Sequence, residues 1–299
     1  MKKFRAPVAF ITFNRPDTTA EVFARIREAK PEKLYHISDA PREGNESDKE
    51  KVAACKELVQ KGIDWDCELI PVYAESNMGC KGRVWTGITE VLNREECTII
   101  LEDDVVPEPD FFPYCERLLE LYADDPHVMM ISGTNLVRDR KIEEAYCFSC
   151  FSSIWGWATW ARAWKLYDPD VKDWPQRDAE GSLRGIYGKK RYFFLKRDID
   201  SVYTKKKDTW DIQWDYCRHI HRGLGIVPAE NLVRNIGFDR EDATHTKDST
   251  KEDFSCGSVR FPLEKLPVKR DLEYDRAYLA KYFGMNKLVN FAKKKLVRK

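Results

Sequence analysis

The sequence lacks two features that would assign it to common functional classes. No apolar run approaches the ~20 residues needed to cross a bilayer, and the first such run, Pro7 to Phe13, stops at Asn14-Arg15-Pro16. We interpret that run as a strand rather than as part of a secretory signal. Charge of one sign is not in excess, because 51 basic side chains are balanced by 50 acidic ones, so no strong field favours nucleic acid. These absences predict a cytoplasmic protein with no nucleic acid partner.

The cysteines also lack the pattern of a zinc knuckle or a disulfide framework. Nine cysteines are scattered along the chain, and only Cys147 and Cys150 have C-x-x-C spacing. A structural zinc site of that type needs a second such pair. We therefore expect reduced cysteines that pack in the interior, as is usual in a cytoplasm.

The sequence does contain an alternation of apolar runs and segments with helical spacing. The polar run 42–51 is predicted to be part of a loop. Strands that alternate with helices predict an α/β fold whose sheet is covered by helices on both faces. The strands are expected at residues 7–13, 33–38, 67–72, 98–101 and 128–132, and the helices at 18–29, 52–61, 82–92 and 111–122.

Polar groups follow three of the expected strands. They are Thr12 to Arg15, Ser38-Asp39 and Glu102 to Asp104. In open parallel sheets the ligand crevice lies beyond the carboxyl ends of the strands. We therefore expect these three segments to meet at one edge of the sheet.

Three adjacent carboxylates, Glu102-Asp103-Asp104, emerge from the buried strand 98–101. Ionised carboxylates repel one another unless a cation lies between them. Mg²⁺ or Mn²⁺ prefers such oxygen ligands and keeps positions open for phosphate oxygens. A solvated acidic loop is the alternative interpretation of the same residues.

Residues 101–105, Leu-Glu-Asp-Asp-Val, and then 109–112, Pro-Asp-Phe-Phe, resemble the metal motif of inverting glycosyltransferases of the GT-A fold. The resemblance is to N-acetylglucosaminyltransferase I and to family 2 glycosyltransferases, and it covers roughly residues 7–245. It implies that Asp104 holds Mn²⁺ or Mg²⁺, that Asp103 contacts the donor, and that Glu102 supports both. The implied fold is GT-A, a Rossmann-like mixed sheet flanked by helices.

The same resemblance extends to the other strand ends. It implies an arginine at the first strand end, Arg15, that meets the donor, and an aspartate at the second, Asp39, that reads the uracil. Lys81 stands near the family's donor-binding histidine, so the transferred sugar stays open, and a thymidine donor is nearly as compatible as a uridine donor. The expected donor contacts are Thr12, Asn14, Arg15, Asp39, Lys81, Arg83, Glu102 and Asp103.

A tryptophan-rich segment resembles the aromatic acceptor loop of the family. Indole rings stack on the apolar faces of sugars, and their N–H groups donate to hydroxyls. The spacing of Trp157, Trp160 and Trp164 also matches one face of a helix, and for these three we favour a core role. The acceptor candidates are Trp155, Gly156 and Trp157, with Trp155 preferred.

Inverting transfer needs a carboxylate to take the proton of the acceptor hydroxyl. Residues 208–215 offer three candidates, Asp208, Asp211 and Asp215. Asp211 follows Trp210 in a Trp-Asp step that resembles the one containing the family's catalytic base. Asp215 remains an alternative because it lies on the same expected helical face. His245 lies where many GT-A enzymes carry a histidine that completes the metal or diphosphate site.

The resemblance divides the chain into three parts. Residues 1–106 are the expected nucleotide-sugar-binding half, 107–250 the acceptor-binding and catalytic half of the same domain, and 251–299 a C-terminal extension.

Other classes of protein fit the sequence less well. A haloacid dehalogenase phosphatase needs an Asp-x-Asp early in the chain, a sugar nucleotidyltransferase needs a glycine-rich loop after the first strand, and a non-catalytic carbohydrate-binding protein has no use for the acidic strand end.

The tail 281–299 carries seven basic residues and no acidic one. Interleaved apolar residues give it the composition of an interfacial membrane helix. A helix packed on the domain with a lysine-rich end is the alternative. The first interpretation predicts attachment to an anionic membrane surface, on the inner face, where a lipid-linked glycan would be the acceptor.

Overall fold

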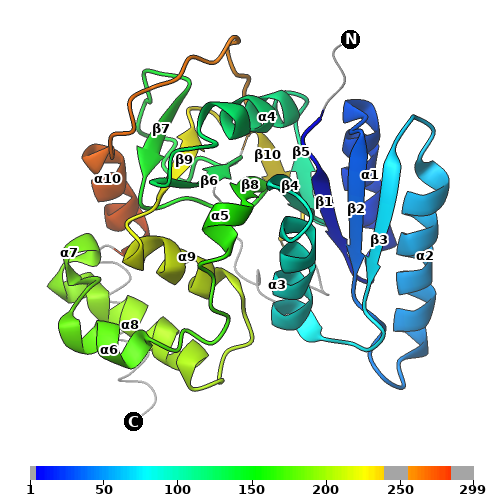
Figure 1. Cartoon of the computed structure of the whole chain (residues 1–299), viewed down its shortest axis with the longest axis horizontal. Coiled ribbons are helices and arrows are strands. Elements are labelled where there is room, and N and C mark those ends of the chain that lie inside the picture. Colours follow the sequence, from blue (N-terminus) through cyan, green and yellow to red (C-terminus); the bar gives the residue numbers. More distant parts are fainter. Residues whose placement is uncertain (1–4, 239–254, 284–299) are drawn as a thin grey trace.

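The structure, a computed structural model, describes residues 5–238 and 255–283. Figure 1 shows the arrangement of its strands and helices. The strands are β1 Val8–Thr12, β2 Lys33–Ser38, β3 Glu68–Tyr73, β4 Cys97–Glu102, β5 Val105–Pro107, β6 Val128–Ser132, β7 Tyr146–Ser149, β8 Trp157–Trp160, β9 Leu224–Pro228 and β10 Val233–Asn235. The helices are α1 Pro16–Ala29, α2 Glu46–Gly62, α3 Gly79–Leu92, α4 Phe111–Leu121, α5 Ala161–Trp164, α6 Trp174–Glu180, α7 Arg184–Tyr187, α8 Lys189–Tyr203, α9 Asp211–Ile220 and α10 Leu272–Phe283.

The main sheet has eight strands in the order β3-β2-β1-β4-β8-β6-β9-β7. β3, β2, β1 and β4 are mutually parallel, β8 is antiparallel to β4 and β6, and β7 is antiparallel to β9. A small antiparallel pair, β5 and β10, lies beside it. The predicted α/β fold, a mixed sheet flanked by helices, is confirmed.

Side chains alternate between two hydrophobic layers on the two faces of the sheet, as the pleat of a strand requires. In β1, Val8 and Phe10 belong to the layer that includes residues of α1 and α4. Ala9 and Ile11 belong to the layer that includes residues of α3. Because both faces are covered, β1 and the centre of β4 are continuously buried, which explains their unbroken apolar runs.

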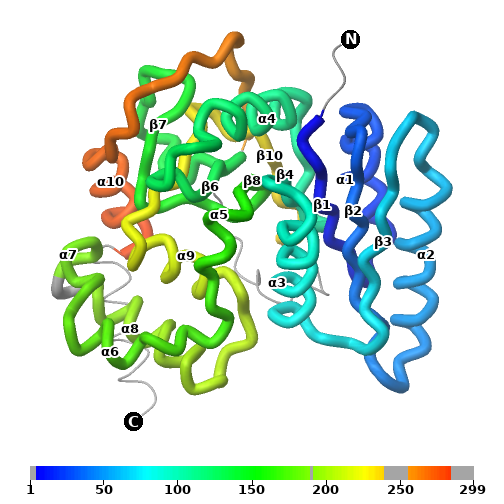
Figure 2. The backbone as a smooth tube through the Cα atoms, viewed as in Figure 1, coloured from blue at the N-terminus to red at the C-terminus, as the bar shows by residue number. Residues whose placement is uncertain are grey.

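The second half of the chain continues the same sheet and adds a group of helices. Figure 2 shows α6, α7 and α8 gathered at the end of the molecule away from α1 and α2. The described part of the C-terminal extension packs back onto this half. Ser149 Oγ donates to the buried carboxylate of Asp275 at 2.5 Å, and Leu266 N donates to Tyr122 Oη at 2.9 Å. No helix of the described residues is both long and apolar enough to cross a membrane.

Two local predictions were wrong. The polar run 42–51 contains the first turn of α2, because the Asn45 side chain accepts from Asp48 N and caps the helix. Trp157 and Trp160 lie in strand β8 rather than in a helix. They therefore point to opposite faces of the sheet, and only Trp157 shares a layer with Trp164.

Candidate active site

The ends of three neighbouring strands bring the predicted polar residues to one edge of the sheet. β1 lies between β2 and β4, and the three strands are parallel. Thr12 lies opposite Ser38, and Ile11 lies opposite Glu102, so the strands finish at the same level. The prediction that these strand ends meet is confirmed.

Glu102, Asp103 and Asp104 form an acidic cluster beside Arg15. Arg15 Nη1 lies 3.3 Å from Asp104 Oδ2 and 3.8 Å from Asp103 Oδ1. Burial, and then the charges of Asp104, Asp103 and Asp211, raise the pKa of Glu102 to about 8. Added positive charge at this cluster therefore relieves repulsion between like charges.

The acidic cluster fits a hard divalent cation that shares its coordination with a ligand. Among residues 5–238 and 255–283, no three His, Cys, Asp or Glu side chains are grouped so as to hold an ion by themselves. The Asp104 side chain is 20% exposed, and Mg²⁺ is commonly bound by one or two carboxylates plus phosphate oxygens. An ion at this cluster would need further oxygen ligands besides these side chains. His245, the other predicted metal ligand, lies outside the described residues.

Asp211 begins α9 and lies near the acidic cluster, since its charge contributes to the raised pKa of Glu102. The hydroxyl of Thr209 donates to Asp211 Oδ1, which orients the carboxylate. The α9 helix therefore brings a carboxylate from the second half of the chain to the end of β4.

Asp215, the alternative base, pairs with a fully buried arginine. Arg218 Nη2 donates to Asp215 Oδ1 at 2.6 Å. Arg218 Nε and Nη1 have no hydrogen-bond partner within the described chain. Desolvation by the surrounding protein outweighs the opposing effect of Arg218 and raises the pKa of Asp215, although part of its side chain is exposed. We interpret Asp215 as the counter-ion of Arg218, because its loss would leave a buried cation unpaired.

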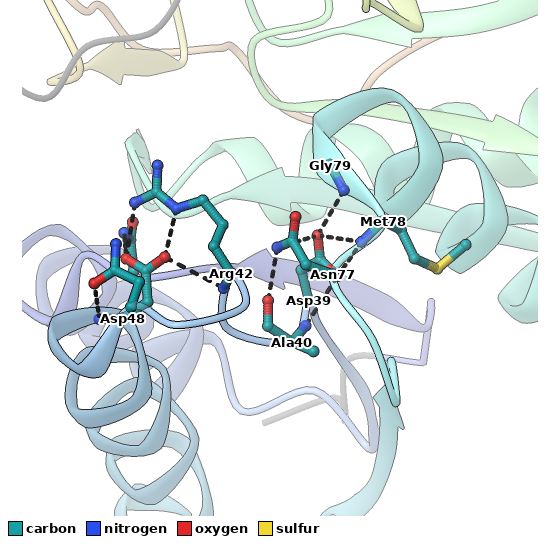
Figure 3. Close-up of polar contacts among 9 residues, drawn as sticks. Asp39, Ala40, Arg42, Asp48, Asn77, Met78 and Gly79 are labelled. Atoms are coloured by element: carbon teal, nitrogen blue, oxygen red, sulfur yellow. Dashed lines mark hydrogen bonds and ion pairs between the residues drawn. The ribbon is translucent and has the colours of Figure 1, made fainter.

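Asp39 lies at the end of β2 and holds the start of α3 (Figure 3). Its Oδ1 accepts from Ala40 N at 2.9 Å and from Met78 N at 3.0 Å. Its Oδ2 accepts from Gly79 N at 3.0 Å and from Asn77 Nδ2 at 3.1 Å. Burial raises the pKa of Asp39, and these backbone N–H groups oppose the shift. The carboxylate predicted to read a uracil is thus 5% exposed and engaged in internal hydrogen bonds.

The two basic residues predicted on α3 differ in accessibility. Lys81 Nζ lies 3.5 Å from Asp170 Oδ1, and part of the Lys81 side chain is exposed. Arg83 is buried, and its Nη2 donates to the carbonyl of Val72 at 2.8 Å. Lys81 can therefore approach a ligand at the sheet edge, whereas Arg83 acts on that edge through its charge beside Asp39.

Two other predicted donor contacts, Thr12 and Asn14, make internal hydrogen bonds. Thr12 is buried, and its Oγ1 lies 2.9 Å from His36 Nε2. Asn14 Nδ2 donates to Asp48 Oδ1 at 2.8 Å. Both side chains hold the shape of the β1 end, and Asn14 remains partly exposed.

The three acceptor candidates separate into one partly exposed side chain and two buried positions. Trp155 is partly exposed and makes an edge contact with Phe238 at 5.2 Å between ring centroids. Gly156 has a φ of +56°, and a Cβ there would collide with Val233. Trp157 is fully buried and stacks on Trp210 at 5.7 Å. Trp157 is therefore a core residue, the role that we favoured for it, and its side chain is not accessible to an acceptor.

Sequence reasoning missed two residues beside the site, Asn77 and Cys80. Asn77 contacts Asp39 directly. Cys80 is exposed in the first turn of α3, and Asp208 lies beside the same turn, since a Cβ at Gly79 would lie 3.3 Å from Asp208 Oδ2. Desolvation, and then negative charges that include those of Glu102 and Asp208, raise the pKa of Cys80 to about 12. The strand-end rule, applied also to β3, would have indicated the polar segment that leads to Asn77.

Comparisons with known proteins give only distant structural similarity. No family model matches the sequence, and no curated protein sequence matches it significantly. The galactosyltransferase LgtC, in complex with donor and acceptor sugar analogs, is similar with a TM-score of 0.38 and 8% identity over 71% of this chain and 69% of its own. The inositol-1-phosphate CTP transferase from T. maritima gives 0.32 and 10% over 56% and 74%. Apo UDP-glucose pyrophosphorylase gives 0.37 and 10% over 74% and 90%. Similarity at this level identifies neither an activity nor a ligand.

Proposed function

We propose that the protein is a GT-A glycosyltransferase that moves a sugar, with inversion, from a nucleoside diphosphate donor to a carbohydrate acceptor. The observation that carries the proposal is the acidic cluster at the end of β4, which lies beside Arg15 and level with the ends of β1 and β2. Asp211 is near enough for its charge to contribute to the raised pKa of Glu102. The acidic cluster is suited to bind a cation that also contacts a diphosphate, and the carboxylate of Asp211 is suited to accept a proton. Two such groups from distant parts of the chain are what an inverting displacement needs.

In the proposed reaction the acceptor hydroxyl attacks the anomeric carbon from the face opposite the diphosphate. Asp211 takes the hydroxyl proton as the new C–O bond forms. The bond between the anomeric carbon and the diphosphate oxygen breaks, and the nucleoside diphosphate leaves with the electron pair. Thr209 donates to one oxygen of Asp211, so the other oxygen is available for the proton.

The remaining residues bind and orient the donor. Asp104 would hold Mn²⁺ or Mg²⁺, which supplies positive charge to the departing diphosphate. Arg15 lies beside the Asp104 carboxylate, so its guanidinium can add a second positive charge near the diphosphate. Lys81, in the first turn of α3, can neutralise further phosphate charge. The partly exposed ring of Trp155 is the group suited to stack on an acceptor sugar.

A transfer assay with a panel of UDP- and dTDP-sugars tests the proposal. The purified chain should release nucleoside diphosphate, through transfer or slow hydrolysis, only when Mn²⁺ or Mg²⁺ is present. NMR of the product should show an inverted anomeric configuration. Binding without release would indicate a carbohydrate-binding or nucleotide-binding protein instead. Pyrophosphate formed from a nucleoside triphosphate and a sugar phosphate would indicate a nucleotidyltransferase.

A further inference from the structure

The Asn77 side chain is held in one orientation at the sheet edge beyond β2 and β3. Its Nδ2 donates to Asp39 Oδ2 at 3.1 Å and to the carbonyl of Ala40 at 2.7 Å (Figure 3). Both partners are oxygens that only accept, so the amide group must direct its NH₂ toward them. The two N–H groups are thereby used, and Asn77 Oδ1 is left as an acceptor. Asn77 itself is exposed, and nothing in the described chain donates to that oxygen.

Asp39, by contrast, has no capacity left for a ligand. A carboxylate offers about four lone-pair sites. Four groups already donate to it, namely the N–H groups of Ala40, Met78 and Gly79 and the amide of Asn77. A ligand that bonded to Asp39 would have to displace the start of α3. The free acceptor at this edge is therefore on Asn77, one residue outward from Asp39.

Asn77 lies at a suitable separation from the acidic cluster. The cluster follows β4, and β1 and β2 lie between β4 and β3. Strands in a sheet are about 4.8 Å apart, so the ends of β2 and β3 lie about 10 Å and about 14 Å from the end of β4 along the edge. Asn77 contacts Asp39 at the end of β2, so its separation from the cluster is within this range. Between them lies Phe13, with the guanidinium of Arg42 5.7 Å from its ring centroid. An aromatic ring and a guanidinium are groups on which a planar base can stack.

We propose that Asn77 Oδ1 accepts the imide N3–H of a uracil or thymine base and so selects the donor nucleotide. This inference rests on the proposed function, since it assumes a nucleotide-sugar donor on this edge. Uracil and thymine carry a hydrogen at N3, whereas cytosine presents a lone pair that Oδ1 repels. Asn77 is thus a specificity-determining residue, and Asp39 is the positioning residue that orients it.

A cycle of two proteins and two ligands tests the assignment. Binding of UDP and of N3-methyl-UDP to the wild type and to Asn77→Ala is measured by calorimetry with Mn²⁺ present. The wild type should prefer UDP by roughly tenfold, the value of one hydrogen bond, and Asn77→Ala should bind the two ligands about equally. A merely structural loss would weaken both ligands by the same factor and keep their ratio.

The outcomes separate this inference from the proposed function. If the wild type binds UDP but the variant keeps the tenfold preference, Asn77 does not read the base. If the wild type binds UDP and N3-methyl-UDP equally, no acceptor faces N3 and the inference is wrong. If the wild type binds no nucleoside diphosphate, the proposed function is itself overturned. Circular dichroism of Asn77→Ala should confirm that the variant is folded.

Discussion

Asp211 and Asp215 lie one turn apart on α9 but have different chemical surroundings. Asp211 lies near the acidic cluster, whereas Asp215 is paired with buried Arg218. Asp211→Asn should keep UDP binding and reduce turnover by ~10² to 10⁴, because the amide cannot take a proton. Single-turnover kinetics and calorimetry check this result.

Asp215→Asn is the matched control, and it should keep turnover near that of the wild type. Asp215→Ala should lower the free energy of unfolding by about 1 to 3 kcal/mol, because a buried guanidinium loses its acceptor. The Asp215 side chain is 43% exposed, so we expect less than the loss of a fully buried pair. If Asp215→Asn abolished turnover and Asp211→Asn did not, the two roles would have to be exchanged.

Asp104 contributes its side chain to the site and its backbone to the fold. Its carbonyl accepts from Ile236 N at 2.8 Å, and that bond survives in Asp104→Ala. The variant should fold normally and lose metal-dependent turnover by about 10³-fold, because a metal ligand is worth several kcal/mol in the transition state. In the wild type, Mn²⁺ should increase the rise in melting temperature that UDP causes. In Asp104→Ala, Mn²⁺ should not change that rise.

A carboxylate away from the site provides the comparison for Asp104. Asp198 lies on α8 and is partly exposed, so Asp198→Ala should leave both turnover and the Mn²⁺ effect unchanged. Near wild-type turnover of Asp104→Ala with Mn²⁺ present would contradict the assignment of Asp104 as a metal ligand.

At the scale of elements, α10 shows where the C-terminal tail can be removed. α10 spans Leu272–Phe283, and Tyr274, Asp275 and Leu279 are buried. Lys281 Nζ donates to the carbonyl of Leu136 at 3.0 Å, so the first basic residue of the tail contacts the body of the protein. A truncation after Asp275 would remove part of the core, whereas one after Phe283 keeps all of α10.

The chain that ends at Phe283 tests the predicted membrane contact. Residues 284–299 lie outside the described residues and carry six of the seven basic side chains of the tail. Each can add about 1 kcal/mol of attraction to an anionic surface. The full chain should therefore co-sediment with anionic vesicles at low salt, and the truncated chain should not. Equal binding by the two chains would exclude the tail as an anchor.

At the scale of the whole molecule, two buried histidines should make the fold sensitive to acid. Burial, and then the charge of Lys56, lowers the pKa of His36 to about 3, and burial followed by Arg218 lowers that of His219 to about 3. As the pH falls, each of these histidines takes up a proton near pH 6.5 in the unfolded chain but only near pH 3 in the folded state. Stability is thus fully present above pH 6.5 and falls as the pH drops toward 3, by about 2 kcal/mol per histidine at pH 5.

Urea titrations between pH 7.5 and pH 5 check this dependence. His219 Nε2 donates to the carbonyl of Cys150 at 2.9 Å, and its Nδ1 lies 3.3 Å from the hydroxyl of Tyr187. Both ring nitrogens are engaged in the neutral form. His219→Gln should be less stable at pH 7.5 but should lose less stability on acidification. If the free energy of unfolding of His219→Gln fell with pH as steeply as that of the wild type, His219 would not be the responsible group.

The sequence by itself determined the features that depend on neighbours along the chain. The apolar runs of β1, β2 and β4, and the polar groups that follow them, predicted a sheet edge with Glu102, Asp103 and Asp104. Those features are local, because a buried strand needs a continuous apolar run and must end in polar residues where it reaches solvent. The start of α2 was missed because its cap, Asn45, lies in a polar run that is also typical of loops.

Only the tertiary structure decided the roles that depend on contacts between distant segments. Asp39 and Asn77 are 38 residues apart, and which of them keeps a free acceptor follows from their hydrogen bonds to each other. Asp211 and Asp215 lie on the same face of the helix, so their spacing in the sequence does not distinguish them. Asp215, and not Asp211, is paired with Arg218 in the folded protein. Trp157 is enclosed by other tryptophans because β8 inserts between β4 and β6. Such environments arise from non-local packing, which hydrophobic periodicity does not encode.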